Sequence, residues 1–230
     1  MAMDQQAAME RLRELYQEKN EHLETFLEAV TPFEFYREIF PVGSFERKGH
    51  FEDEKGNGIA VTVPPKAAGI ALEIKEEGKA KRYTITDELS ELSEVYNTDF
   101  TIMSPLSYFG WRRCGKNARY LYALVFDLDG VGMLQLRDTL HQMNKDILPQ
   151  ATFVVNSGTG LHLYYVLDEP IPMYPHNQKC LKELKYSLTR QIWNRYTSTI
   201  KEPQMQGILQ GFRVVGSGSK LGREYPVTAY

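Results

Sequence analysis

Residues 124–130 read LVFDLDG and place Asp127 and Asp129 at the end of an apolar run. An apolar run of this kind is typical of a buried strand. In a strand, residues i and i+2 point to the same face about 6.8 Å apart, so the two carboxylates project side by side. Adjacent carboxylates repel each other unless a cation lies between them, and their oxygens suit a hard divalent ion. The stretch therefore predicts a metal site at the end of a buried strand.

The alternative for this stretch is a plain turn. Asp129 and Gly130 could form a turn and cap before the next helix. That arrangement would leave Asp127 inside an apolar strand without a partner, which is energetically costly. Metal binding accounts for both aspartates.

A second motif, NSGTGLHLYY, occupies residues 156–165. Glycines at 158 and 160 permit a sharp hairpin turn and a close approach of a ligand to backbone amides. Such a turn also places hydroxyl groups and amides where an anion could bind. His162 shares a strand face with Tyr164 and Val166, so a hydrogen-bonded core histidine is the alternative to a ligand-binding one.

A third motif, FRVVGSGSK, occupies residues 212–220 and combines Arg213 and Lys220 with the small residues Gly216, Ser217 and Gly218. A loop of this composition can be a plain surface turn. Its two cations are also suited to charge-assisted hydrogen bonds with phosphate.

Two families have first motifs that resemble VFDLDG. In haloacid-dehalogenase phosphatases a DxDG motif opens the domain with its nucleophile, and VVNSG resembles their second motif. Those domains close with another acidic pair after a further strand. Here the first motif arrives only at residue 127, and no Asp lies between residue 170 and the end of the chain.

The three motifs in this order resemble those of the archaeo-eukaryotic primase superfamily, above all the primase-polymerases of plasmids and other mobile elements. The resemblance covers about residues 100–223. It implies that Asp127 and Asp129, with a third carboxylate, hold two Mg²⁺ or Mn²⁺ ions. It also implies nucleotide-binding residues in the second and third motifs: Ser157, Gly158, Thr159, Gly160, His162, Arg213, Ser217 and Lys220.

The third carboxylate departs from the family pattern. The family has an Asp about ten residues before the arginine of its third motif. The only acid in that window here is Glu202, eleven residues before Arg213. A glutamate can ligate the same ion through a longer arm, so we expect Glu202 to be the third metal ligand and catalytic carboxylate.

Residues 110–117, GWRRCGKN, match GxxxxGK but are not a P-loop. The motif ends in Asn where magnesium needs Ser or Thr, and it precedes a strand instead of following one. Four cations in and beside this stretch either bind a template strand or flank a solvated loop. These candidate template-binding residues are Arg112, Arg113, Lys116 and Arg119.

The periodicity of the chain predicts an α+β fold with two lobes that form one catalytic domain. Residues 1–100 are expected to form a helical and β-hairpin lobe, with helices over 3–30 and 33–40, strands at 58–64, 69–77 and 80–86, and a short helix over 87–96. Residues 101–230 are expected to form a lobe with a mostly antiparallel sheet, and the family resemblance implies that this lobe is RRM-like. Its expected strands are 119–128, 151–156 and 161–171, with helices over 131–147 and 177–197.

Composition excludes several classes of protein. The 230 residues carry a net charge of −3, with 12 basic against 21 acidic residues up to residue 100 and 9 against 3 from residue 171 onward. Cys114 and Cys180 form no zinc or disulfide pattern, so any metal must be held by carboxylates. No apolar stretch approaches the roughly 20 residues that span a bilayer, and the charged N-terminus does not resemble a signal peptide. We therefore expect a cytoplasmic protein without membrane contact.

These observations predict a DNA primase or polymerase: a template-dependent nucleotidyltransferase that uses nucleoside triphosphates on single-stranded DNA, with or without a primer. A metal-dependent phosphohydrolase and a catalytically silent nucleic-acid-binding module are the two alternatives. The terminal VTAY carries no evident closing element, which is compatible with a helicase or another C-terminal domain following Tyr230 in a longer protein.

Overall fold

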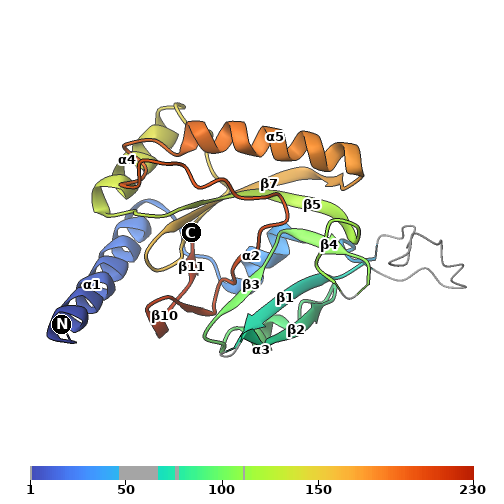
Figure 1. The fold of residues 1–230 in the computed structure, drawn as a ribbon, viewed down its shortest axis with the longest axis horizontal. Helices are drawn as coiled ribbons and strands as arrows, with labels where there is room; N and C mark the ends of the chain where they lie inside the picture. Colours follow the sequence, from blue (N-terminus) through green and yellow to red (C-terminus); the bar gives the residue numbers. More distant parts are fainter. Residues whose placement is uncertain (1, 47–66, 76–77, 111) are drawn as a thin grey trace, which may run out of the picture.

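The computed structural model describes residues 2–46, 67–75, 78–110 and 112–230. The fold is α+β, as expected, and Figure 1 shows its elements. The helices are α1 (Ala2–Phe26), α2 (Pro32–Ile39), α3 (Leu92–Val95), α4 (Met133–Asn144) and α5 (Pro175–Ile192). The first strands are β1 (Gly69–Ile74), β2 (Ala80–Ile85), β3 (Thr101–Met103), β4 (Leu106–Tyr108), β5 (Ala118–Leu128), β6 (Phe153–Asn156) and β7 (Leu161–Pro172). The remaining strands are β8 (Phe212–Arg213), β9 (Gly218–Ser219), β10 (Gly222–Pro226) and β11 (Thr228–Ala229).

The larger sheet has the strand order β11-β6-β7-β5-β4, and all of its pairings are antiparallel. The long strands β5 and β7 lie at its centre. Their register places Asp127 directly opposite His162. The first and second motifs are therefore neighbours across one strand pair.

A second sheet has the order β2-β1-β3-β8, again antiparallel. The expected hairpin of 69–77 and 80–86 is present as β1 and β2. The strand expected at 58–64 lies outside the described residues. The expected lobe boundary near residue 100 falls between strands of this sheet, because β3 and β8 come from the second part of the chain. The division into two lobes stays a prediction.

The two faces of the larger sheet carry different layers. Leu124, Phe126 and Leu128 of β5 pack with buried residues of α4 and α5, which cover one face in Figure 1. Ala123 and Val125 pack on the opposite face with residues of α2 and the second sheet. Asp127 belongs to this second face, because side chains alternate along a strand. The alternation thus directs Asp127 toward the space between the two sheets.

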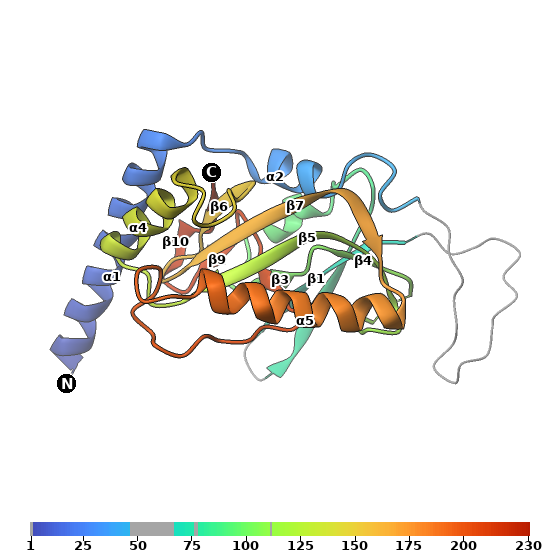
Figure 2. The ribbon, with the colours of Figure 1, turned by 90° about the horizontal axis from the view of Figure 1, so that it is seen from above.

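Helix α1 lies across the end of the larger sheet at which β5 ends and β7 begins (Figure 2). Its buried side chains are Tyr16, Lys19 and Leu23, at helical spacing. Phe26, the last residue of the helix, is 64% exposed. A lysine therefore occupies the centre of the buried face.

Two further expectations need correction. The terminal VTAY carries a structural element, because its residues Thr228–Ala229 form β11, which pairs with β6. The helix expected over 87–96 is reduced to the single turn α3, preceded by turns. Of the helices in the described part of the chain, none is long and apolar enough to cross a membrane.

Candidate active site

The carboxylates of Asp127 and Asp129 lie at the end of β5, where Gly130 turns the chain with a φ of +67°. Their side chains are 29% and 26% exposed, so both are accessible from solvent. Asp127 Oδ1 lies 3.4 Å from His162 Nε2, and Asp129 Oδ1 lies 3.9 Å from Lys220 Nζ. The three sequence motifs therefore converge at these two carboxylates.

His162 is 3% exposed, and its ring packs edge-on against Phe212 with centroids 5.5 Å apart. Burial lowers the pKa of His162, and the charge of Asp127 partly opposes this shift. Nδ1 is buried and has no hydrogen-bond partner among the described residues. His162 is therefore part of the core, with one ring nitrogen near Asp127, and its role in binding a nucleotide stays a prediction.

The turn of residues 157–160 packs against the end of β5. Gly158 has a φ of +103°, which favours glycine. A Cβ atom on Gly160 would lie 2.6 Å from the carbonyl oxygen of Leu128 and 3.5 Å from Asp129 Oδ1. Any larger residue at 160 would therefore displace the turn from the carboxylates.

The third motif brings its cations to the same place. Lys220 reaches Asp129, and Arg213 stacks over the ring of Phe100 at 4.0 Å and donates to the Gly218 carbonyl oxygen at 3.2 Å. Burial lowers the pKa of Arg213, while Asp127 opposes the shift. The Ser217 hydroxyl is buried and donates to the carbonyl oxygen of Val214, so its hydrogen bond is made within the loop.

Glu202 lies apart from this cluster. Its side chain is exposed in the segment between α5 and β8. Among the residues that the structure describes, no group of three or more His, Cys, Asp and Glu side chains is arranged to hold a metal ion. Glu202 therefore does not complete a three-carboxylate set with Asp127 and Asp129 in this conformation, and its role stays a prediction.

Two residues of the site were missed by the sequence analysis. Gln206 contacts the backbone of Asp127 through both ends of its side-chain amide. Lys185 of α5 is 2% exposed, and its Nζ donates to the Gly207 carbonyl oxygen at 3.3 Å and lies 5.2 Å from the Phe212 ring centroid. Burial lowers the pKa of Lys185 to about 8, and Asp127 opposes the shift. No local pattern marked either residue, because both act through contacts far along the chain.

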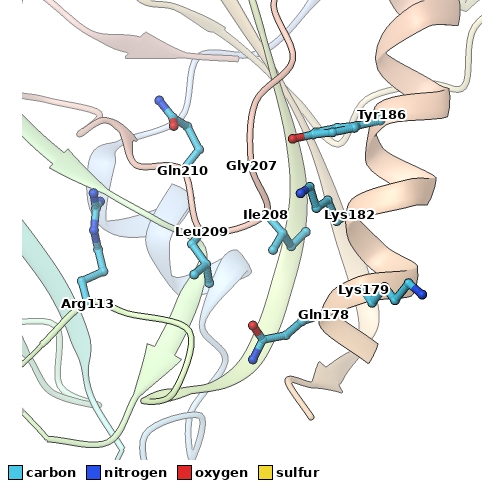
Figure 3. Close-up of a pocket in the computed structure, with 9 residues that line it drawn as sticks. All are labelled: Arg113, Gln178, Lys179, Lys182, Tyr186, Gly207, Ile208, Leu209 and Gln210. Carbon is cyan, nitrogen blue, oxygen red and sulfur yellow. The ribbon is translucent and has the colours of Figure 1, made fainter. Parts of the chain in front are cut away.

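A pocket of about 580 Å³ lies between α5 and the segment that follows Gln206 (Figure 3). Lys182 and Tyr186 extend from α5 toward this segment, whereas Lys179 extends away from it. Arg113 lies on the other side of Leu209, and its buried Nη1 has no hydrogen-bond partner in the described part of the chain. The lining residues are Arg113, Gln178, Lys179, Lys182, Tyr186, Gly207, Ile208, Leu209 and Gln210.

The other expected template-binding residues lie on the loop before β5 or at its start. Arg112 and Lys116 are exposed, and Arg119 is half-buried with its guanidinium 4.4 Å from the Phe109 ring centroid. Of the four, Arg113 alone lines the pocket. Their role in binding a template stays a prediction.

The two aspartates fit a divalent cation by the chemistry of their donors. Both carboxylates are accessible, and the side chains within ion-pair distance of them are His162 and Lys220. Magnesium in proteins is often held by one or two carboxylates, with water and phosphate oxygens completing its coordination. Asp127 and Asp129 alone can therefore anchor an ion that also binds a phosphate.

The chain matches no protein-family model and no curated protein. Among solved structures, it is similar to the AEP domain of the cyanophage S-2L primase-polymerase (PP-N190), with a TM-score of 0.50 and 13% identity over 71% of this chain and 80% of that one. The polymerase domain of Mycobacterium tuberculosis ligase D, solved in complex with DNA, gives a TM-score of 0.31 and 21% identity over 69% of this chain and 61% of that one.

At 13% identity, the likeness to the cyanophage domain establishes the fold alone. The chain thus has the fold of an archaeo-eukaryotic primase-polymerase domain. The resemblance drawn from its three motifs is confirmed at this level.

Proposed function

We propose that this chain is a template-dependent nucleotidyltransferase that joins nucleoside triphosphates on single-stranded DNA. The observation that supports this most directly is the convergence of three distant segments on one pair of carboxylates. Asp127 faces His162 across the β5–β7 pair, and Asp129 faces Lys220 from the third motif. Phosphoryl transfer requires carboxylates that bind a metal ion and, beside them, cationic side chains that bind phosphate.

In the proposed reaction, the 3′-hydroxyl of the growing strand attacks the α-phosphorus of a nucleoside triphosphate. A new phosphodiester bond forms at the α-phosphorus, and the bond from this phosphorus to the oxygen that bridges to the β-phosphate breaks. Pyrophosphate leaves, and the hydroxyl proton is released. Mg²⁺ or Mn²⁺ bound by Asp127 and Asp129 would lower the pKa of the hydroxyl and neutralise charge on the leaving pyrophosphate. The two carboxylates would hold the cation in a fixed position, because they project from the end of a rigid strand.

The triphosphate would lie between the second and third motifs. Lys220 and Arg213 supply charge-assisted hydrogen bonds to its oxygens. The turn of residues 157–160 supplies backbone amides and the hydroxyl groups of Ser157 and Thr159. Lys220 is 3.9 Å from Asp129 and its side chain is 56% exposed, so it can move to a bound phosphate without breaking a close hydrogen bond.

The template strand would run along the pocket between α5 and residues 207–210. Its lining contains Arg113, Lys179 and Lys182 but no acidic residue. Tyr186 offers a ring on which a base can stack, and cations that follow a phosphate backbone give binding without sequence preference. Gly207 in its wall directly follows Gln206, which is hydrogen-bonded to the backbone of Asp127.

The proposed function is tested with a single-stranded template of one repeated base, labelled nucleotides and Mn²⁺, followed by sizing of the products. We expect products longer than one nucleotide that contain only the complementary base. Release of inorganic phosphate independent of template would indicate the phosphohydrolase instead. DNA binding without any synthesis, unchanged when both aspartates become Asn, would indicate the silent binding module.

The same assay tests the third carboxylate. Because Glu202 is exposed and outside the cluster, we expect Glu202→Gln to keep synthesis close to wild type. A loss of orders of magnitude at low metal concentration would show instead that its segment moves to place Glu202 on the ion.

A further inference from the structure

Lys19 is a cation buried beneath the second motif. Its side chain extends from α1 and is fully buried. Nζ donates to the carbonyl oxygens of Gly158 at 2.8 Å and Gly160 at 3.3 Å. Within the described ranges, no carboxylate lies at ion-pair distance from Lys19, because every salt bridge there joins other residues. The lysine therefore holds the turn of residues 157–160 without a counter-ion of its own.

The two hydrogen bonds fix the direction of the turn's amides. In a trans peptide the carbonyl of one residue and the N–H of the next point in opposite directions. Because the Gly158 carbonyl points to Lys19, the Thr159 N–H points away from α1. The amides of Thr159 and Gly160 donate no hydrogen bond within the part of the chain that the structure describes. The turn thus has donors to offer a ligand on the side opposite the lysine.

Neighbouring residues of α1 hold the turn at its base. Asn156 Nδ2 donates to Asn20 Oδ1 at 2.7 Å and to the Tyr16 carbonyl oxygen at 3.2 Å. Asn156 Oδ1 in turn accepts from the Gly158 amide at 3.2 Å. The turn is therefore attached to one helix through Tyr16, Lys19 and Asn20.

A buried cation without a counter-ion costs folding free energy. Burial lowers the pKa of Lys19 to about 8, so the amine stays largely protonated at neutral pH. An apolar side chain would fill the same space without this cost. An anion bound on the far side of the turn would offset it, since charges interact strongly where water is excluded.

We propose that Lys19 is a positioning residue for nucleotide binding: it orients the turn of residues 157–160 and supplies a buried positive charge to the phosphates bound on the opposite side. The inference rests on the proposed function, in which this turn binds the triphosphate. It makes the N-terminal helix part of the nucleotide site, outside all three sequence motifs.

The test measures the Kd of dATP, dAMP and deoxyadenosine by titration calorimetry. Lys19→Met removes the donor and the charge, Lys19→Gln keeps a donor without charge, and Lys19→Arg keeps both. Arg11→Met is the matched control, because it removes an exposed cation of the same helix, paired only with Glu14 and Glu18. Thermal melts establish that each variant folds, and single-stranded DNA binding is measured in parallel.

We expect Lys19→Met and Lys19→Gln to raise the Kd of dATP about tenfold or more, with a smaller effect on dAMP and none on deoxyadenosine. Lys19→Arg and Arg11→Met should stay within about threefold of wild type, and DNA affinity should not change. Should Lys19→Met fail to fold, the contrast between Lys19→Gln and Lys19→Arg decides the question.

Equal dATP affinity in wild type, Lys19→Gln and Lys19→Met would overturn the inference while leaving the proposed synthesis intact. An equal loss for dATP and deoxyadenosine would also overturn it, since it would show a structural role only. A wild type that binds dATP in a Lys19-dependent way but extends no strand would refute the proposed function and sustain the inference. A wild type that binds no dATP would refute both.

Discussion

Gln206 is bonded to Asp127 at both ends of its side-chain amide: Oε1 accepts from the Asp127 N–H at 3.1 Å, and Nε2 donates to the Asp127 carbonyl oxygen at 3.0 Å. On the other side, Asp127 is paired with His162 of β7. Strand β4 pairs with β5 only up to Leu121. At Asp127, the side chain of Gln206 makes the two backbone hydrogen bonds that a neighbouring strand would otherwise make. The backbone of Asp127 is thereby held from both edges.

Replacing Gln206 should disturb the position of Asp127 more than the binding of substrate. We expect Gln206→Ala to lower kcat for strand extension about 10- to 100-fold with a nearly unchanged KM, because small displacements of a reacting group are costly. Gln204→Ala, at an exposed position of the same segment outside the pocket, is the control. Steady-state kinetics with both variants provides the measurement; a rise in KM at constant kcat would contradict this role.

Lys220 should act on nucleotide and not on template. Lys220→Ala is expected to raise the KM for nucleotide about tenfold while the Kd for single-stranded DNA stays constant, since the proposed function assigns Lys220, which lies 3.9 Å from Asp129, to the triphosphate. Lys201→Ala removes an exposed lysine from the segment before β8 as a control. Weaker DNA binding with an unchanged nucleotide KM would assign Lys220 to the template instead.

The pocket beside α5 should contribute salt-dependent affinity for single-stranded DNA. If Lys182 contacts one phosphate, Lys182→Ala should weaken binding to all sequences alike and reduce the slope of log K against log salt by about 0.7. Lys145→Ala, exposed at the end of α4, should leave the slope unchanged. Fluorescence anisotropy at several salt concentrations measures both. An identical slope for Lys182→Ala and wild type would remove this lysine from the template path.

Burial of Lys19 makes stability depend on pH. Its pKa falls from 10.5 in the unfolded chain to about 8 in the folded protein. Between these values the unfolded state binds more protons, so stability rises with pH; below about pH 8 the cost of the buried charge is fully present. The unfolding free energy of wild type minus that of Lys19→Met should therefore increase by up to about 3 kcal/mol from about pH 7 to about pH 10.

Urea unfolding of both proteins at the two pH values tests this. Lys185 has a similarly lowered pKa, but it is present in both proteins and cancels in the difference. A difference that does not change with pH would mean that Lys19 keeps an ordinary pKa in the folded protein.

The central strands and the second motif could be predicted because their signals are local. Alternation along β7 correctly separated His162 and Tyr164 from Leu161 and Leu163, which pack on opposite faces of the sheet. Lys19 could not be found this way, since it lies 139 residues from Gly158 and looks like any lysine of a charged helix. The strands β8, β9 and β11 are two residues long, too short to show a period.

Spacing alone did not identify which residue of 202–213 contacts Asp127. Glu202 was chosen because it is the only acid in the window, yet the residue of that segment that contacts Asp127 is the neutral Gln206. Spacing measures distance along the chain, whereas an irregular segment can bring any of its residues to the site.

In the proposed function, Asp127 and Asp129 hold the metal for nucleotidyl transfer. The most direct measurement is primer extension on a single-stranded template, with Mg²⁺ or Mn²⁺, by wild type, Asp127→Asn and Asp129→Asn. Both variants should melt close to the wild-type temperature, because each loses one of two repelling carboxylates, and both should lose synthesis by about 10³-fold or more. Wild-type extension by either folded variant would contradict the account.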